Sequence, residues 1–81
     1  MTIEELDLIT HQLHDVISAN VIRCRKSSGV SQLQLALDIG LTGNAFIARA
    51  EKRVNDAHFN IENLVKISTI LEIDICEFFR E

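Results

Sequence analysis

Residues 31–53 read SQLQLALDIGLTGNAFIARAEKR and carry the local signals for two short helices with a sharp turn between them. Ser31 is a typical N-cap, and Gln34 three residues later has the spacing of a capping box. Gly40 can adopt the left-handed conformation that ends a helix, and Thr42 can cap the next one. The predicted buried faces are Leu33, Ala36 and Leu37 in the first helix and Phe46, Ile47 and Ala50 in the second. The stretch therefore predicts a helix-turn-helix arrangement.

The first 27 residues also have a helical pattern. Apolar residues recur every three or four positions through residues 2–27, which predicts helix over this range. Thr2 and Glu5 have the spacing of a capping box, and the early acids and late bases suit the helix dipole. The pattern is compatible with one long helix or with two helices that break near residues 18–20. An apolar stripe in the first half can pack on its own domain or on a partner helix; it consists of Leu6, Ile9, Leu13 and Val16.

Two further helices are predicted after the motif. Residues 54–60, VNDAHFN, are expected to form a polar loop. Asn60 can cap a helix over residues 61–71, and Asp74 with Glu77 makes a capping box for a short last helix. The apolar residues of that last helix, expected to fold back on the core, are Ile75, Phe78 and Phe79. The chain therefore predicts a compact, all-α domain of five helices, with an N-terminally extended first helix.

The composition fits one small helical domain. The 81 residues include no proline or tryptophan and only three glycines, and 47% of them are hydrophobic. No apolar run approaches the roughly 20 residues that a membrane span requires. The first residues, MTIEELD, are acidic and show no secretory signal. We therefore expect a cytoplasmic protein that does not insert into a membrane.

The formal net charge of −4 hides an uneven distribution. Residues 1–22 contain four acids and no lysine or arginine, and residues 61–81 contain five acids and two bases. Residues 23–60 contain six bases and three acids. Positive charge is thus concentrated in the segment with the two short helices, where contacts to nucleic-acid phosphates would be made.

The chemically reactive residue types form no pattern typical of catalysis or metal binding. Cys24 and Cys76 fall on apolar helical faces, which predicts buried free thiols over a disulfide or redox switch. His11, His14 and Asp15 share a helical segment but lack a further strong ligand, so surface histidines are favoured over a metal site. No serine, cysteine or aspartate has the partners that a nucleophile needs. We expect no enzyme activity, no cofactor and no metal.

From about Val21 to Phe79 the chain resembles the lambda-repressor-like helix-turn-helix family, the XRE/Cro-type group of phage repressors and bacterial regulators. The matching pieces are VIRCRKSSGVSQLQLALDIGLT, IARAEK and NIENLVKISTILEIDICEFF. The more specific elements are Ser31 with Gln32, Gly40, Glu51 and the closing apolar pattern. The resemblance implies a DNA-binding domain over residues 21–81 with its motif at residues 31–53. Residues 1–20 are then an N-terminal helical extension and a candidate dimerisation element.

The chain departs from the family pattern near the motif. Between Leu41 and Glu51 there is an additional residue, which we place at Gly43. The segment from Glu51 to Asn60 is longer than the common form and lacks the glycine that usually follows the glutamate. These departures affect the start and the end of the second motif helix.

The resemblance also implies roles for individual residues. In the family an arginine late in the first helix pairs with a glutamate late in the recognition helix, which gives Arg25 and Glu51 a structural role. Asparagine can bond adenine, arginine can bond guanine, and alanine can pack on a thymine methyl group. The implied candidates for base contacts are Gln32, Asn44, Ala45 and Arg49. The implied candidates for phosphate contacts, which set register and affinity, are Lys52, Arg53, Asn55 and Asn60.

These features predict a small, sequence-specific DNA-binding transcriptional regulator. It would resemble Cro-like or restriction-modification controller proteins and bind double-stranded DNA as a homodimer on a pseudo-palindromic operator. The alternative is a protein-interaction module with a helix-turn-helix fold, or an antitoxin, that acts mainly through a protein partner. The acidic net charge and the small residues Gly43, Ala45 and Ala48 motivate this alternative.

Overall fold

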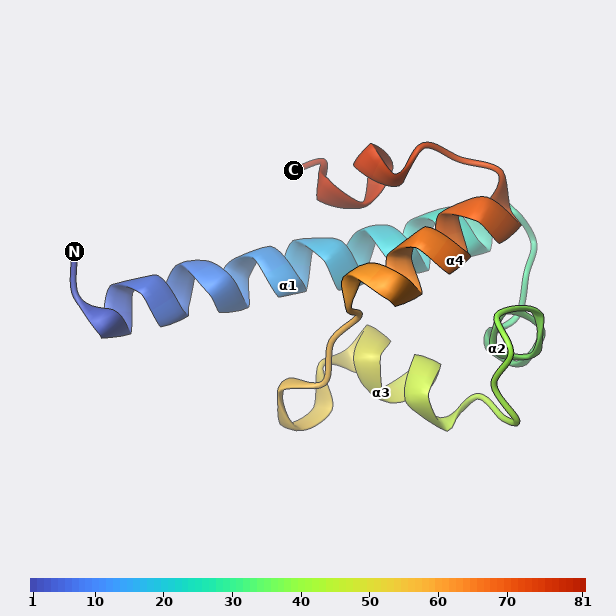
Figure 1. The fold of residues 1–81 in the computed structure, drawn as a ribbon, viewed down its shortest axis with the longest axis horizontal. Coiled ribbons are helices and arrows are strands. Elements are labelled where there is room, and N and C mark those ends of the chain that lie inside the picture. The colour runs from blue at the N-terminus through green and yellow to red at the C-terminus, as the bar shows by residue number, and fades with distance from the viewer.

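Helix α1 (Ile3–Ser27) is the longest element, and the shorter elements lie along its second half (Figure 1). The computed structural model describes all 81 residues and contains no strand, which confirms the predicted all-helical class. After α1 the chain forms α2 (Gln32–Asp38), α3 (Ala45–Lys52), the 3₁₀ helix η1 (Val54–Asp56), α4 (Ile61–Leu71) and the 3₁₀ helix η2 (Ile75–Phe79). Both α3 and η2 pack directly on α1, and α2 contacts α3 and α4.

Helix α1 is continuous over its 25 residues, which decides between one helix and two. The Thr2 hydroxyl accepts a hydrogen bond from the Glu5 backbone N–H at 3.1 Å, and the Glu5 carboxylate accepts one from the Thr2 N–H at 3.0 Å. The predicted capping box is thus confirmed. The acids of the first turn, Glu4 and Glu5, and the bases of the last turn, Arg25 and Lys26, complement the helix dipole.

Polar residues in the middle of α1 tie it to other segments. The buried Ser18 hydroxyl donates to the Ala50 carbonyl of α3 at 2.9 Å. The buried Asn20 amide donates to the Phe78 carbonyl at 3.0 Å and to the Arg80 carbonyl at 2.6 Å. These side chains satisfy distant backbone groups, so residues 18–20 do not interrupt the helix.

The first half of α1 projects from the body of the molecule (Figure 1). Every residue from Met1 to Leu13 is exposed, and the first α1 residue of the core is Ile17. The molecule therefore measures 40 Å along its longest axis but only 24 and 19 Å along the others. We call residues 1–13 the arm. Its stripe residues Leu6, Ile9 and Leu13 are exposed. Helix α1 continues unbroken across residue 20, where the sequence places the end of the extension.

One core joins the second half of α1 to α2, α3, α4 and η2. Phe59 and Phe78 are its largest fully buried side chains. The half-buried Phe46 of α3 meets Phe59 edge-on, with ring centroids 5.8 Å apart. The buried apolar residues are Ile17, Val21, Cys24, Leu35, Ala36, Ile39, Ile47, Ala50, Phe59, Leu64, Ile67, Leu71 and Phe78. None of the helices is both long enough and apolar enough to cross a membrane.

The predicted buried face of α2 is wrong in part. Leu33 and Leu37 are each 49% exposed, whereas Leu35 is fully buried. The inward face of this short helix is formed by Leu35, Ala36 and Ile39, which lie within one turn of each other. Leu33 and Leu37 then fall on the opposite flank because successive residues turn by about 100°.

The predicted count of five helices is also wrong, since the structure has four α-helices and two 3₁₀ helices. The last predicted helix is the 3₁₀ helix η2. Asp74 accepts a hydrogen bond from the Cys76 N–H, only two residues on, at 2.8 Å. The Glu77 carboxylate instead bonds the Arg80 guanidinium at 2.8 Å, so no capping box forms. Phe78 is buried, but the adjacent Phe79 stays 38% exposed.

The two cysteines have different surroundings. Both are free thiols, and Cys24 is buried while Cys76 is exposed. The prediction of a buried thiol is therefore wrong for Cys76, which lies on the solvent side of η2. A hydrogen bond to Asp74 raises the pKa of the Cys76 thiol, which keeps it protonated and weakly nucleophilic.

Candidate nucleic-acid interface

Helices α2 and α3 are the two helices of the motif predicted at residues 31–53. The Ser31 hydroxyl caps α2 by accepting a hydrogen bond from the Gln34 N–H at 3.0 Å. The Gln34 side chain bonds Asp38 at 2.7 Å, so the predicted box is only half formed. Gly40 follows α2 with φ +93°, the left-handed region that glycine tolerates. The predicted Thr42 cap is wrong: α3 begins at Ala45, after a turn in which the half-buried Leu41 packs against the core.

A buried ion pair fixes α3 to α1. Arg25 Nε donates to Glu51 Oε2 at 2.7 Å, and Arg25 Nη2 donates to Glu51 Oε1 at 3.0 Å. The two side chains are only 9% and 3% exposed. Arg25 Nη1 also donates to the Val30 carbonyl at 2.9 Å, just before α2. The structure thus brings together the two residues to which the resemblance assigns a structural role, and the paired guanidinium holds three segments in fixed relation.

Gln32 extends this network to the start of α3. Its amide nitrogen donates to Glu51 Oε1 at 2.8 Å, and its carbonyl oxygen lies 3.5 Å from the Asn44 amide nitrogen. Gln32 sits on the inward side of α2, so it is half buried. Both ends of this side chain are therefore occupied within the motif, which argues against the base contact predicted for it. The exposed Asn44 lies at the open edge of the network.

The outer face of α3 is open to solvent. Ala45, Arg49 and Lys52 are spaced by four and three residues, which places them on one face of the helix, and all three are exposed. Neither Arg49 nor Lys52 makes a side-chain hydrogen bond or an ion pair in this structure. The arm projects away from this face and does not cover it (Figure 1). Two unneutralised cations and two small or polar side chains thus share one exposed surface, which we call the α3 face: Asn44, Ala45, Arg49 and Lys52.

Arg53 does not belong to this surface, which corrects the prediction of a phosphate contact. Its side chain is only 13% exposed. Its Nε donates to Asp15 at 2.9 Å, and its Nη1 donates to the Asp56 and Ala57 carbonyls at 3.0 and 3.1 Å. Arg53 therefore ties α1 to the connection between α3 and α4, and its charge is neutralised inside the molecule.

The two asparagines predicted to contact phosphates have local structural roles. Asn60 caps α4, because its side chain accepts from the Asn63 N–H at 2.7 Å. Asn63 returns a hydrogen bond to the Asn60 N–H at 2.9 Å, so the predicted cap is present. Asn55 is exposed and has φ 51°, a left-handed conformation that asparagine tolerates better than most residues. Neither residue lies on α3.

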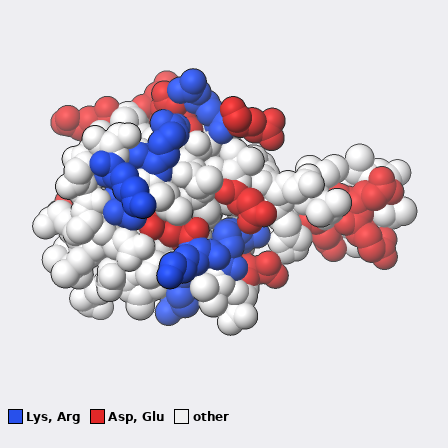
Figure 2. All heavy atoms as spheres, turned by 180° about the vertical axis from the view of Figure 1, so that it is seen from behind, with Lys and Arg blue, Asp and Glu red and all other residues white.

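The charges are separated over the whole molecule. Figure 2 shows acidic and uncharged side chains on the projecting arm, whereas the lysines and arginines gather over the body. Several of the basic side chains on the body are neutralised by carboxylates, including Arg23 by Glu77 at 3.7 Å. Of the eight basic side chains, only Lys26, Arg49 and Lys52 have no carboxylate partner, and two of these three belong to the α3 face.

A histidine cluster links α1 to the connection between α3 and α4, and the sequence pattern does not predict it. The rings of His14 and His58 are stacked, with centroids 4.0 Å apart and 26° between their planes. His14 Nδ1 is shielded from solvent and has no hydrogen-bond partner. The two residues are 44 positions apart, so no local pattern could indicate their contact. No group of three or more histidine, cysteine or acidic side chains is arranged to hold a metal ion.

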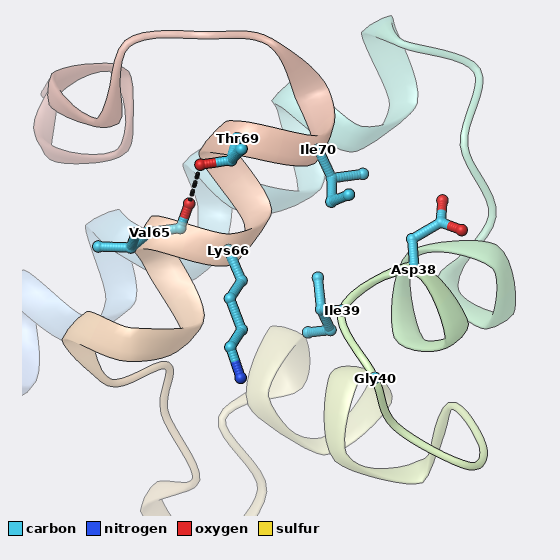
Figure 3. Close-up of a pocket in the computed structure, with 7 residues that line it drawn as sticks. All are labelled: Asp38, Ile39, Gly40, Val65, Lys66, Thr69 and Ile70. Atoms are coloured by element: carbon cyan, nitrogen blue, oxygen red, sulfur yellow. Dashed lines mark hydrogen bonds between the residues drawn. The ribbon is translucent and has the colours of Figure 1, made fainter.

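An open groove of about 420 Å³ lies between the end of α2 and α4. Its lining consists of Asp38, Ile39, Gly40, Val65, Lys66, Thr69 and Ile70. Figure 3 shows the Lys66 side chain running alongside Ile39, while the Asp38 carboxylate points away. The Thr69 hydroxyl donates to the Val65 carbonyl of its own helix at 2.7 Å. The groove therefore presents one amino group and no pair of groups suited to acid–base or nucleophilic chemistry.

No family model matches the chain, and no curated protein or solved structure shows significant similarity to it. Its function is therefore inferred from the arrangement of its own side chains.

Proposed function

We propose that the chain is a sequence-specific DNA-binding transcriptional regulator of lambda-repressor-like architecture. In this proposal α3 enters the major groove of double-stranded DNA, and two copies bind the half-sites of a pseudo-palindromic operator. The protein acts in the cytoplasm and has no catalytic role. The observation that carries the proposal is the α3 face, where Arg49 and Lys52 are exposed and unpaired on a helix that is otherwise anchored.

The buried network supports this role because it leaves the orientation of α3 little freedom. Glu51, within one turn of Arg49 and Lys52, is bonded to Arg25 and Gln32. Ala50 is held from the other side by Ser18. A helix fixed in this way presents its outer side chains in a constant geometry, which direct reading of base edges requires.

The residue types on the α3 face suit the two parts of DNA recognition. Asn44 can bond adenine through two hydrogen bonds, Arg49 can bond guanine in the same way, and Ala45 can pack on a thymine methyl group. Lys52, at the end of the helix, suits a phosphate, which contributes affinity without sequence information. One such face reads few base pairs, and two copies on one operator combine their specificities.

The experiment that tests the proposal begins with selection from a pool of randomised DNA duplexes at low salt. The selected sequence is then used to measure the affinity of variants as salt is raised. We expect Arg49→Ala to lose about 1 to 3 kcal/mol at one base position and to relax the preference there. Lys52→Ala should weaken binding to all sequences and reduce the slope of log affinity against log salt by about one.

Arg80→Ala is the control because it removes one exposed cation that directly follows η2, away from α3 (Figure 1). Its affinity should stay near that of the unmodified chain. Failure to enrich any sequence, or an equal loss in the Arg80 and Lys52 variants, would contradict the proposal.

A second function, binding of a protein partner, is favoured by the exposed arm. Ile3 and Leu8 are 70% and 58% exposed on the part of α1 that projects from the body of the molecule (Figure 1). A partner held by such apolar surface stays bound at high salt, whereas a DNA complex dissociates. Pulldown at low and high salt, with a chain that lacks residues 1–10 as control, distinguishes the two functions.

A further inference from the structure

The histidine cluster joins α1 to the connection between α3 and α4. His58, in that connection, stacks on His14 of α1, and its Nδ1 lies 2.9 Å from the Asp56 carbonyl oxygen. His11, one turn before His14, has its Nδ1 3.4 Å from the Asp56 carboxylate and 3.3 Å from Arg53 Nη2. Together with the Arg53–Asp15 pair, these contacts attach the connection to α1 at several points.

The connection attached by this cluster has an unfavourable backbone. Arg53, Asn55 and Asp56 have φ angles of 58°, 51° and 62°, all in the left-handed region. L-residues enter this region at a cost, and they remain there only when surrounding contacts hold them. The connection is therefore a segment that would relax if its attachment to α1 were lost.

The surroundings of His14 favour its neutral form. Desolvation lowers the pKa of His14, and the neighbouring His58, Arg53 and His11 act in the same direction, while Asp15 opposes them. The remaining charged group, the Asp56 carboxylate, is 74% exposed and faces His11. If both stacked rings carried a proton, two cations would lie 4.0 Å apart beside the Arg53 guanidinium.

We propose that His14 and His58 form a proton-sensitive latch: protonation breaks their stacking and releases the α3–α4 connection from α1. Release reaches α3 through the next residue, Phe59, which is buried and packs edge-on against Phe46 of α3. The latch itself does not depend on the proposed DNA binding. If both proposals hold, acidification weakens the hold on the recognition helix and hence its affinity for DNA.

Two NMR measurements between pH 8 and pH 5 test the latch. Ring signals give the protonation midpoint of His14, and hydrogen exchange gives the protection of amides in residues 54–60. We expect His14 to titrate below the ordinary value of about 6.5. Between about pH 6.5 and that midpoint, protection of the connection should fall by up to about tenfold for each unit of pH, after correction for intrinsic exchange, and it should level off below the midpoint. Amides of α4 around Leu64 should keep their protection, which distinguishes local release from unfolding of the whole chain.

Two variants separate the latch from other effects of acid. His58→Gln removes a group that lowers the pKa of His14, so the His14 midpoint should move up. The double variant His14→Phe with His58→Phe keeps two aromatic rings but cannot titrate there. Its connection should remain protected at pH 5. An ordinary midpoint for His14, or equal loss of protection in the double variant and the unmodified chain, would overturn the latch and leave the DNA-binding proposal untouched.

Discussion

At the scale of single residues, the buried Arg25–Glu51 pair is the contact whose loss should destabilise the fold most. Glu51→Ala leaves the guanidinium buried without its partner, and we expect a loss of about 3 to 5 kcal/mol in the free energy of unfolding. Urea unfolding followed by circular dichroism measures this loss. Glu62→Ala is the control, because it breaks an exposed pair with Lys66 at 3.8 Å and should cost less than about 1 kcal/mol. Similar losses in the two variants would contradict the role given to Glu51.

His14 should make the stability of the whole chain depend on pH. Its pKa is lowered in the folded state, chiefly by desolvation, so the unfolded chain binds a proton more readily. The contribution of His14 to the free energy of unfolding is therefore fully present above about pH 6.5. It is lost as the pH drops toward the pKa of His14 in the folded state. Urea unfolding at a series of pH values gives the slope of the free energy of unfolding against pH. This slope should be smaller for His14→Phe than for the unmodified chain. His11→Gln, which removes a histidine from the preceding turn, should keep most of the slope.

At the scale of elements, the sequence predicted what depends on neighbours along the chain. Thr2, Ser31 and Asn60 cap the helices that begin at residues 3, 32 and 61, because a cap acts within one turn. The capture of Arg53 by Asp15 could not be predicted in this way, since 38 positions separate the two residues. The sequence does not predict the 3₁₀ form of η2. Asp74 accepts from the Cys76 N–H and Glu77 bonds the Arg80 guanidinium, whereas a capping box requires Asp74 and Glu77 to bond each other's backbone.

The α3 face depends both on the local sequence and on contacts between residues that are distant in the sequence. Asn44, Ala45, Arg49 and Lys52 were identified from the sequence, and their exposure agrees with a contact surface. Gln32 and Arg53 have the same residue chemistry but are occupied inside the molecule. Only three-dimensional packing separates the free side chains from the occupied ones.

The turn between α2 and α3 should depend on one of its two glycines. Gly40 has φ +93°, whereas Gly43 is not in the left-handed region, and a Cβ atom would meet nothing within 4 Å at either position. Gly40→Ala should therefore cost about 1 to 2 kcal/mol through backbone strain alone. Gly43→Ala should change stability by less than about 0.5 kcal/mol. Thermal unfolding of the two variants measures the difference, and equal effects would show that the conformation of Gly40 does not matter for the turn.

At the scale of the whole molecule, the arm is the part that a single copy leaves unsatisfied. Leu6, Ile9 and Leu13 recur at helical spacing and are 48%, 50% and 43% exposed. Covering such a stripe with a second copy would remove apolar area from water on both partners. The arm also carries three acids and no lysine or arginine, so it is poorly suited to lie on DNA itself. These two properties make it the candidate for the dimer contact that the proposed operator binding requires.

The double variant Leu6→Gln with Leu13→Gln should convert the proposed dimer into a monomer. Each leucine buried between subunits contributes about 1.5 to 3 kcal/mol, and the symmetry of a dimer doubles the effect of each substitution. Light scattering over a range of concentrations measures the mass. Leu33→Gln with Leu37→Gln is the matched control, because it removes two leucines of similar exposure from α2. A monomeric mass for this control, with an unchanged dimer for the arm variant, would place the interface on α2 and free the arm for another partner.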